Sequence, residues 1–573
     1  MRILKLDIKN YRNLGGVIIN LHPEINFIVG ENNLGKSNLL DLLNILFNRN
    51  NFSESDFFDI ESEISISFSL QLSDIEQGFF EDLFDPDNRS LINIEAIQEA
   101  PDESIRFIHK ESEISISSSV VKCVNYIHYD SLRNPFSELS FTKNRGVGKF
   151  LNHIIIKYLQ DDELQDSDFF VLDNIDEFIF SVNQSLQKIR SFREFSVQAV
   201  REENKESLLA NLVLLADNNN RPLGELGYGV QFSIIIALSI FERLLSLSKQ
   251  RLDRSVIEDT SCSKKCIPIL IGLDEPEIHL HPYAQRSLIK YLARIVSNNE
   301  PDFGSLLAEI FQVDKLLGQI IVASHSPNLL LNDYRQYLRF CKDENNSLVV
   351  KSGSDISLDL AIEKQLLKNL PYVKESFFSK VVIFVEGDSE LGALPVFFKR
   401  LDLDPDDLGV SIIQAGSADS IPPLMRLLNE FYIQNMGLMD SDKRDIYGDN
   451  SDLFFTQGID FEEDIYENFY IPDYAKYLEN EFPNERRANF FIGKARSAGI
   501  NLDPHDLMSD QLRQLSSDKI QEIKINSRQD ILDKLRRSKS ILTGRDLGVH
   551  VTDIPQIYLD LIERTVELSR NTN

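Results

Sequence analysis

The chain has 573 residues, of which 42% are apolar and 26% are charged. At about 150 residues per domain this is too long for one hydrophobic core, and the composition excludes collagen-like, low-complexity and mostly disordered proteins. Sixty Lys and Arg residues stand against ninety Asp and Glu residues, a net charge of −30. This charge is opposite in sign to that of a protein that binds nucleic acid with its whole surface, so any contact with DNA is expected to be local.

The N-terminal residues alternate apolar and charged side chains at Leu4, Leu6 and Ile8, which predicts a half-buried strand and not a secretion signal. No later stretch reaches the eighteen or so apolar residues of a membrane span, so we expect a cytoplasmic protein without membrane contact. His279 and His281 lack further ligands nearby, which favours a packing or dimer-interface role over zinc. The cysteines are too few for a disulfide framework or a zinc site; they are Cys123, Cys262, Cys266 and Cys341.

Residues 30–37, GENNLGKS, match the phosphate-binding loop G-x-x-x-x-G-K-[ST]. The match follows the apolar segment 25–29 and precedes a helical pattern. In such a loop, backbone N–H groups wrap the phosphates, the lysine reaches the β- and γ-oxygens, and the serine hydroxyl ligates Mg²⁺. The residues expected to hold ATP here are Gly30, Asn32, Asn33, Gly35, Lys36, Ser37 and Asn38.

Two features follow the loop. The heptapeptide ESEISIS occurs at 61–67 and again at 111–117, which predicts two similar exposed strands of one antiparallel sheet, because two copies do not make a solenoid. From about residue 148 to 215 the pattern becomes helical and charged, with Phe150, Leu151 and Ile154 at helical spacing. This segment is expected to be a helical insertion.

Two apolar strands are predicted at 267–273 and 320–323. The first ends in Asp274 and Glu275, where the aspartate would hold the Mg²⁺ shell and the glutamate would orient or deprotonate an attacking water. The second leads into His325, whose imidazole is placed to contact a γ-phosphate. A lone histidine is usually structural, but this one follows the other two motifs in the expected order.

A second series of strands starts near residue 380, after a polar stretch at 343–376 that is expected to hold a domain junction. The strand 380–385 leads into Glu386 and Glu390, which helical spacing can turn toward one site. The strand 436–439 ends in Asp440 and Asp442, and a cluster of Glu462, Glu463 and Asp464 follows. Any one of these acids could be plain surface; together, without Cys or His, they predict Mg²⁺ or Mn²⁺.

The run 524–545 carries seven Lys and Arg residues against two Asp residues, a net charge of +5. A solvated helix face would explain the run by itself, but within so acidic a chain a polyanion-binding surface is favoured. The residues expected to bind the DNA backbone are Lys534, Arg536, Arg537, Lys539 and Arg545.

The order of the first motifs resembles an ABC-type ATPase head of the SMC-like and RecF-like kind. The segment KNYRNL around Arg12 is typical of that group, in which the arginine lies near the nucleotide. The resemblance implies that a signature loop from a second subunit completes the ATP site, and Gly227 and Gly229 in GELGYGVQ occupy that place. The usual serine of this loop is absent, so we expect slow hydrolysis and ATP that acts mainly as a bound conformational signal.

The sequences VEGDSE and DSD after apolar strands resemble the Toprim fold of primases, topoisomerases and certain nucleases. The resemblance implies two metal ions about 3.5 to 4 Å apart. Their ligands would be Glu386, Glu390, Asp440, Asp442, Glu462 and Asp464, with Glu463 as an alternative to either of the last two. Lys539 is the best placed candidate for a catalytic lysine, and Lys534, Arg536 and Arg537 are alternatives. Glu386, Asp440, Asp442 and Lys539 would carry the chemistry here, as Glu275 would at the ATP site.

An ABC head followed by a Toprim domain is the arrangement of the OLD (overcoming lysogenization defect) nucleases, which include effectors of Gabija-like and retron anti-phage systems. The resemblance implies an α/β fold: an ATPase domain from 1–147 and 216–370, a helical dimerisation insertion at 148–215, and a Toprim nuclease domain with basic C-terminal helices at 378–573. It also implies an ATP-gated DNA endonuclease in anti-phage defence.

The resemblance further implies a dimer or tetramer, and as a partner either another defence protein or a retron reverse transcriptase with its msDNA. The alternative is an SMC- or RecF-like repair or sensor ATPase whose Toprim domain is silent without a partner. Long heptad arms, which a purely mechanical protein of that type would carry, do not occur in the chain.

Overall fold

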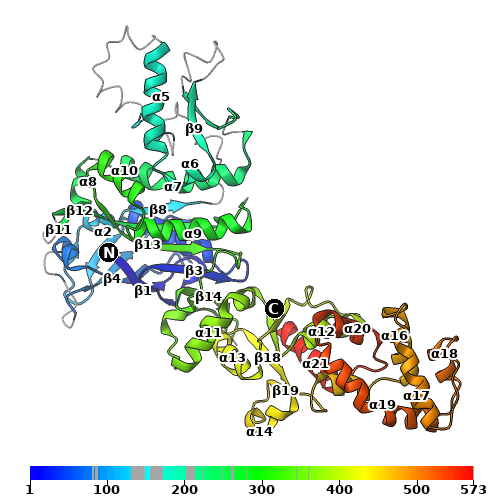
Figure 1. Cartoon of the computed structure of the whole chain (residues 1–573). Helices are drawn as coiled ribbons and strands as arrows, with labels where there is room; N and C mark the ends of the chain where they lie inside the picture. The colour runs from blue at the N-terminus through cyan, green and yellow to red at the C-terminus, as the bar shows by residue number, and fades with distance from the viewer. Residues whose placement is uncertain are drawn as a thin grey trace. The chain divides into compact units, whose positions relative to one another are not determined.

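The chain forms two compact units, Met1–Ile356 and Ser357–Asn573, in a computed structural model (Figure 1). The structure describes residues 1–571 except 81–82, 84–87, 131–147, 149, 152, 155–171, 202–212, 223–224, 248, 260–262, 279, 344 and 359. The interpretations of Cys262 and His279 therefore lie outside the described residues. Within them, no helix combines the length and apolarity needed to cross a membrane.

A mostly parallel sheet forms the centre of the first unit, in the order β11-β12-β13-β3-β14-β15 with β8 paired to β12. Its parallel strands are β3 (Ile25–Gly30), β8 (Tyr126–Tyr129), β12 (Lys264–Asp274), β13 (Lys315–Ala323) and β14 (Tyr337–Lys342), and β11 (Ile257–Asp259) and β15 (Leu348–Ser352) are antiparallel edges. The apolar runs predicted as strands are thus central strands, because both faces of a parallel sheet are covered. Adjacent parallel strands bring the loops after β3, β12 and β13 to one edge.

An antiparallel sheet in the same unit has the order β2-β1-β4-β5-β6-β7. Its strands are β1 (Arg2–Lys9), β2 (Val17–Asn20), β4 (Ile64–Gln71), β5 (Leu91–Gln98), β6 (Arg106–His109) and β7 (Ser115–Ile116). The two ESEISIS copies run into β4 and β7, which confirms that they share one antiparallel sheet, although both strands bury one face. Helix α1 (Lys36–Asn48) shares one core with both sheets, through Phe47, Ile66 and Leu270.

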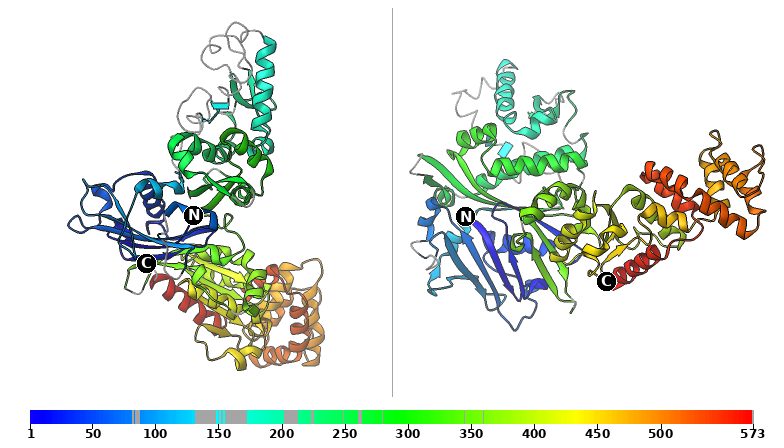
Figure 2. Two further views of the ribbon diagram at one scale, coloured as in Figure 1. Left: turned by 90° about the vertical axis from the view of Figure 1, so that its left-hand side faces the viewer. Right: turned by 60° about the horizontal axis from the view of Figure 1, so that its bottom comes forward.

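The insertion contains more than helices. Helices α5 (Leu172–Leu186) and α6 (Arg190–Glu194) are followed by a hairpin of β9 (Val197–Arg201) and β10 (Val213–Asp217). Short β-branched stretches such as VQAVR pair better as strands than they extend a helix, and the sequence pattern did not indicate them. Figures 1 and 2 show α5 beside β9. Phe150, Leu151 and Ile154 are buried as a helical face requires.

The second unit is built on a four-stranded parallel sheet of order β17-β16-β18-β19. These strands are β16 (Val381–Val385), β17 (Val410–Gln414), β18 (Gln434–Met439) and β19 (Leu453–Phe455). The same unit contains helices α12 (Asp388–Arg400), α13 (Ile421–Glu430), α15 (Phe461–Glu467), α20 (Ile541–His550) and α21 (Gln556–Asn571). Helices α16 (Ile471–Glu481), α17 (Phe490–Ser497), α18 (Met508–Arg513) and α19 (Ser517–Arg537) pack on one another (Figure 1).

Helices α12 and α20 approach each other so closely that only glycine fits at two points. A Cβ atom on Gly392 would lie 2.0 Å from the carbonyl oxygen of Ile541, and one on Gly544 would lie 2.0 Å from the carbonyl oxygen of Ser389. Real Cβ atoms do not approach backbone this closely, so the two glycines set the helix separation. The contact holds the start of α20, and with it Lys539, beside the first turn of α12.

Candidate functional site

The phosphate-binding loop joins β3 to α1 through two glycines with left-handed or strained backbone. Gly30 has φ +132°, and a Cβ there would lie 2.2 Å from the carbonyl oxygen of Phe340. Gly35 has φ +96° and is the N-cap residue of α1. L-residues adopt such angles at a cost, whereas glycine does so readily. The loop therefore leaves backbone N–H groups and the positive end of α1 for phosphate oxygens. Asn32 and Asn33 lie in the turn between the glycines.

Lys36 and Ser37 are the reactive side chains of this loop. The Lys36 ammonium donates hydrogen bonds to the carbonyls of Gly30 at 2.9 Å and Glu31 at 2.6 Å, and burial lowers its pKa to about 8. The Ser37 hydroxyl donates to Asp274 at 3.0 Å. Serine and aspartate from loops far apart in sequence thus meet, as the shared ligation of a nucleotide-bound Mg²⁺ requires.

Arg12 lies at the start of α1. Its guanidinium donates to Asp56 at 2.9 Å, to Asn38 at 2.7 Å and to Asp41 at 2.8 Å. These acceptors hold the arginine beside the first turn of α1. Arg12 therefore lies next to the phosphate-binding loop, as the resemblance of KNYRNL to ABC-type ATPases predicts. The pKa of the Arg12 guanidinium is raised: burial opposes the charge, but Asp41 and the other partners outweigh it.

Asp274, Glu275 and His325 occupy the ends of the adjacent strands β12 and β13. Burial raises the pKa of Asp274 to about 6. Glu275 has φ +45°, and its carboxylate lies 3.7 Å from the imidazole of His325. Burial and then the charge of Lys36 lower the pKa of His325, which places the imidazole near the phosphate-binding lysine. The three residues are brought together with Lys36 and Ser37 as predicted.

Glu277 is a residue that sequence reasoning missed. Its carboxylate accepts hydrogen bonds from the Ser324 hydroxyl at 2.8 Å and from the backbone N–H of His325 at 2.6 Å. Burial raises its pKa. The glutamate therefore ties the loop after β12 to the loop after β13. The letters DEPE gave no signal for this role, because the partner lies in another strand's loop.

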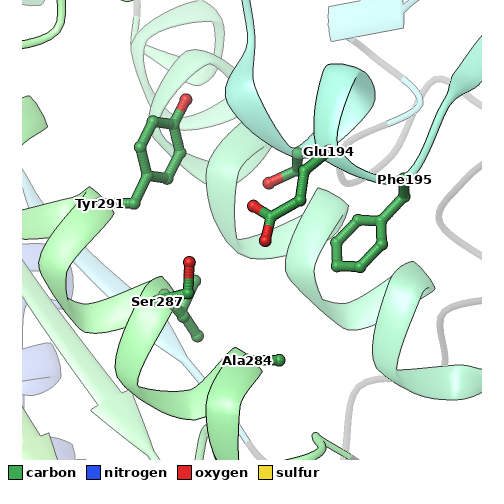
Figure 3. A pocket seen from close by; sticks show the side chains of 7 residues that line it. Glu194, Phe195, Ala284, Ser287 and Tyr291 are labelled. Carbon is green, nitrogen blue, oxygen red and sulfur yellow. The ribbon is translucent and has the colours of Figure 1, made fainter.

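Helix α9 (Pro282–Val296) continues this network toward the insertion. On one side, Gln285 accepts from the Ser326 hydroxyl at 2.6 Å and Arg286 donates to Asn328 at 2.9 Å. On the other side, Arg190 of α6 donates to the Ser287 hydroxyl at 2.9 Å, and the Tyr291 hydroxyl accepts from its backbone N–H at 3.1 Å. Figure 3 shows the end of α6 facing Ser287 and Tyr291.

The expected signature segment begins helix α7 (Tyr228–Ser246). Gly227 is the N-cap residue of this helix, with φ −56° and open space around its Cβ position, and Gly229 lies in the first turn. The backbone at Gly227 therefore does not require glycine. The structure contains one chain, so completion of an ATP site by this segment stays a prediction.

Three carboxylates, from Glu386, Asp440 and Glu390, lie near one another at the ends of strands β16 and β18 and the first turn of α12 in the second unit. The backbone N–H of Asp440 faces Glu386 at 3.5 Å. Burial, then the charges of Glu386 and Glu390, raise the pKa of Asp440 to about 8. Burial raises the pKa of Glu390 to about 7. Like charges this close disfavour one another's ionised forms, and a divalent cation relieves that repulsion.

Glu462 and Lys539 complete this cluster from α15 and from the end of α19. Their charged groups are 2.8 Å apart, with the carboxylate side chain 1% exposed and the lysine 44% exposed. The Ser389 hydroxyl donates to the other oxygen of Glu462 at 2.9 Å. Asp440 and Asp460 also support the charge of Lys539. The lysine predicted from resemblance thus lies at the carboxylate cluster.

The structure places the remaining predicted ligands differently. Asp442 is exposed in the single turn Ser441–Lys443. Asp464 is buried and accepts hydrogen bonds from the backbone N–H groups of Gln457 at 3.1 Å and Gly458 at 2.5 Å. An anchoring role in this loop explains its position, and metal ligation by either residue stays a prediction. Glu463 likewise accepts from a backbone N–H, that of Ile459 at 2.7 Å.

Asp460 is a further residue that the sequence pattern did not single out. It is the N-cap residue of α15 and accepts from the backbone N–H of Glu463. It also accepts from the Arg536 guanidinium at 2.7 Å. An aspartate three residues before a glutamate at a helix start is a capping signal that could have identified it.

The carboxylate set suits a hard divalent ion, because all its donors are oxygens. Among the side chains that the structure describes, no three potential ligands already converge tightly enough to hold an ion. The crowding at Asp440 and Glu390 nevertheless gives the site the charge that Mg²⁺ or Mn²⁺ needs. The residues present therefore fit such an ion.

The basic residues expected to face DNA divide into two groups. Arg536 pairs with Asp460, Lys539 with Glu462, and Arg545 with Asp546 at 2.8 Å. Lys534 and Arg537 are exposed and make no salt bridge among the described residues, although the charge of Lys534 acts on Asp530. Part of the positive charge predicted from sequence is thus neutralised by the chain itself.

Comparisons with known proteins agree with both sites. A family model described as AAA ATPase domain matches residues 1–121 and 90–330, together more than half of the chain. A model described as overcoming lysogenization defect protein-like, TOPRIM domain, matches residues 377–442. The fold and the two sites thus define a P-loop ATPase joined to a Toprim domain, and such domains imply nucleotide binding and the use of a divalent metal.

The chain belongs to the AAA ATPase domain family, and it carries a Toprim domain of the overcoming lysogenization defect-like kind at residues 377–442. The Old nuclease of Escherichia phage P2 is 23% identical over 502 residues, 77% of each chain. The OLD nuclease of Thermus scotoductus is 25% identical over 232 residues, 39% of this chain and 36% of the relative. Endonuclease GajA of Bacillus cereus is 24% identical over 229 residues, 37% of this chain and 30% of the relative.

Proposed function

We propose that this protein is a divalent-metal-dependent endonuclease that hydrolyses phosphodiester bonds of DNA at its Toprim site, under the control of ATP bound to its ATPase domain. The observation that carries the proposal is the meeting of Lys539 with the carboxylates of Glu462, Asp440 and Glu390. A cation beside clustered acids suits a phosphodiester, whose negative charge grows in the transition state. The names of the relatives, which are nucleases, point the same way.

Each residue has a part in this proposal. Glu386, Asp440 and Asp442 would hold the catalytic ions, with Glu390, Glu462 and Asp464 as further candidates. Bound Mg²⁺ or Mn²⁺ supplies charge neutralisation and an activated water. Lys539 faces a non-bridging oxygen of the scissile phosphate, and Glu462 orients its ammonium. Ser389 orients Glu462 in turn through its hydroxyl.

ATP acts mainly as a conformational signal in this proposal. Ser37 and Asp274, which are hydrogen-bonded to each other, would hold the Mg²⁺ of bound ATP. Glu275, which lies 3.7 Å from His325, would orient the attacking water. The expected signature segment, which holds Gly227 and Gly229, lacks the usual serine, so a γ-phosphate contact across a dimer would be missing and turnover would be slow. The active form is a homodimer or tetramer assembled through the ATPase domain and the insertion 148–215, because an ABC-type site is completed by a second head.

A role in bacterial anti-phage defence follows from the resemblance to Gabija-like and retron effectors, with a second defence protein or a retron complex as partner. Expression of the protein in a bacterial host should lower the plaque count of a sensitive phage, and the Asp440→Ala variant should not. Equal plaque counts with the two proteins would remove the defence role and leave the nuclease proposal standing.

The decisive experiment is cleavage of supercoiled and linear DNA by the purified protein with Mg²⁺ or Mn²⁺, with and without ATP. Asp440→Ala should abolish cleavage while ATP binding stays intact. Lys36→Ala should abolish ATP binding and the ATP dependence of cleavage. Cleavage retained by Asp440→Ala would overturn the Toprim assignment. Absence of cleavage by the wild-type protein under every condition would favour the sensor ATPase that needs a partner.

A further inference from the structure

An aromatic and cationic pocket lies among the C-terminal helices, apart from the carboxylate cluster. It has a volume of about 370 Å³ and lies between α16, α17, α19 and the start of α20. This volume is in the range of pockets that hold a small molecule or a nucleotide, roughly 300–1,000 Å³. Its lining includes the rings of Tyr477, Phe482 and Phe490 and the cations Arg487, Lys534 and Arg537.

The cations of the pocket lie against its rings. The Arg487 guanidinium is 3.6 Å from the centroid of the Phe482 ring, and the Lys534 ammonium is 4.2 Å from the centroid of the Phe490 ring. A guanidinium stacked on an aromatic ring forms a flat surface on which a nucleobase can stack. The pocket therefore offers two platforms with a π-face and a positive charge each.

The charge of the pocket is available to a ligand. Arg487 has a partner, Glu485, at 2.6 Å. Arg537, in contrast, makes no salt bridge among the residues that the structure describes, whereas Arg536 and Lys539 on the same segment are paired with acids. Lys534 lies against the Phe490 ring, and its charge acts on Asp530 without forming a salt bridge. In a chain of net charge −30, cations gathered at one pocket favour a polyanion as its occupant.

The pocket is next to the proposed cleavage site. Arg537 lines the pocket and Lys539 contacts Glu462, and two residues of chain span at most roughly 7 Å. The pocket and the proposed cleavage site are therefore neighbours along the chain. Because a base in a duplex is held in its pair and its stack, a base of the bound strand can enter the pocket only if it is unpaired.

We propose that this pocket binds an unpaired nucleotide of the DNA substrate by stacking its base between the rings and cations. The protein then prefers DNA with a single-stranded segment, such as a flap, gap or melted end, at the cut. This proposal rests on the proposed nuclease function in one respect, namely that the neighbouring carboxylate cluster is the cleavage site. Binding of the nucleotide in the pocket can be measured without cleavage.

The test uses the full-length Asp440→Asn protein in EDTA, with fluorescence anisotropy of three labelled oligonucleotides. These are a single strand, the same strand with abasic sites in place of its central bases, and the matched duplex. We expect the normal single strand to bind about tenfold more tightly than the abasic strand, as base stacking on aromatic side chains provides. Phe490→Leu and Arg487→Ala should each reduce this difference, since each weakens one of the two platforms.

A matched control and a second readout keep the outcomes separate. Arg496→Ala removes an exposed cation of α17 that does not line the pocket, and it should leave the tenfold difference intact. Arg537→Ala should weaken binding of the normal and abasic strands alike, because it removes a phosphate contact.

Equal affinities of the Asp440→Asn protein, with its pocket unchanged, for normal and abasic strands would overturn the pocket proposal. So would an unchanged difference in a folded Phe490→Leu protein, a result that would point to another occupant such as an acidic peptide. Neither result bears on the nuclease, which stands or falls with the loss of metal-dependent cleavage in Asp440→Ala.

Discussion

The ammonium of Lys539 lies 2.8 Å from the carboxylate of Glu462, and the lysine is 44% exposed while the glutamate is buried. One partner is thus fixed inside the fold, and the other presents its charge to solvent. We expect Lys539→Ala to lower the rate of DNA cleavage at least about 100-fold, as loss of a single transition-state donor does elsewhere, with little change in DNA affinity. Single-turnover cleavage and anisotropy would measure the two effects. Lys519→Ala, at an exposed position of α19, is the control and should cleave normally.

The fold disfavours the ionised form of the Asp440 carboxyl group, because burial and two neighbouring carboxylates raise its pKa to about 8. Asp440→Asn should therefore raise the melting temperature in EDTA, because it removes repulsion among the acids. It should also abolish the stabilisation that Mn²⁺ gives the wild-type protein. Asp442→Asn, which changes an exposed residue, should leave the melting temperature in EDTA unchanged. A lower melting temperature of Asp440→Asn would contradict the crowding described at this site.

Gly544 sets the separation of α12 and α20, and a methyl group there meets the carbonyl of Ser389. Gly544→Ala should lower the free energy of unfolding by about 1–3 kcal/mol, the usual cost of overpacking, and should slow cleavage by displacing Lys539. Gly493→Ala is the control, because open space surrounds that position in α17 and alanine gains about 0.5–1 kcal/mol over glycine in a helix. Denaturant unfolding of the two variants would compare these effects, and equal stability would refute the close contact.

Gly227 accepts a side chain without strain, because its φ is −56° and its Cβ position is open. Gly227→Ser adds a hydroxyl to the expected signature segment, which lacks the usual serine, and supplies a favourable N-cap to α7. We expect faster ATP turnover by several-fold, measured as phosphate release at saturating ATP. Gly227→Ala lacks the hydroxyl and should not raise the rate. An unchanged rate in Gly227→Ser would show that the missing serine is not what limits hydrolysis.

Asp56 links the ATPase domain's stability to pH. Burial alone would raise its pKa, but hydrogen bonds from Ser53 and Arg12 outweigh burial and hold the pKa below its usual value. The stabilisation is therefore complete above the unfolded pKa of about 3.9 and is lost as the pH falls through the lower folded pKa. The difference in unfolding free energy between wild type and Asp56→Asn should shrink below about pH 4. Urea unfolding from pH 6 to pH 3 would measure it, and a constant difference would disprove the linkage.

Local patterns were sufficient to predict the parts of each site that lie directly after a strand. Lys36, Asp274, Glu386 and Asp440 all follow buried apolar runs, and parallel strands carry their ends to one edge by geometry alone. The same reasoning located the ATPase elements and the parallel strands of the second unit. The β9–β10 hairpin escaped it, since two short alternating stretches within a charged, helical region carry little periodic signal.

Partners that meet only through tertiary packing could not be predicted. The position of Lys539 depends on Gly392 and Gly544, whose role appears only when α12 lies against α20. The basic run looked uniform in sequence, yet Arg536 is committed to Asp460 while Arg537 is not. Charge counting treats these arginines alike, whereas burial and pairing separate them.

Glu277 accepts hydrogen bonds from the Ser324 hydroxyl and from the backbone N–H of His325, so the loops after β12 and β13 are tied to each other. Gln285 and Arg286 of α9 bond to Ser326 and Asn328 in the second of these loops, and Ser287 and Tyr291 of the same helix bond to Arg190 of the insertion. One helix thus joins α6 to the loop that carries His325. The insertion is therefore connected to the surroundings of the phosphate-binding lysine by side-chain hydrogen bonds as well as by the backbone.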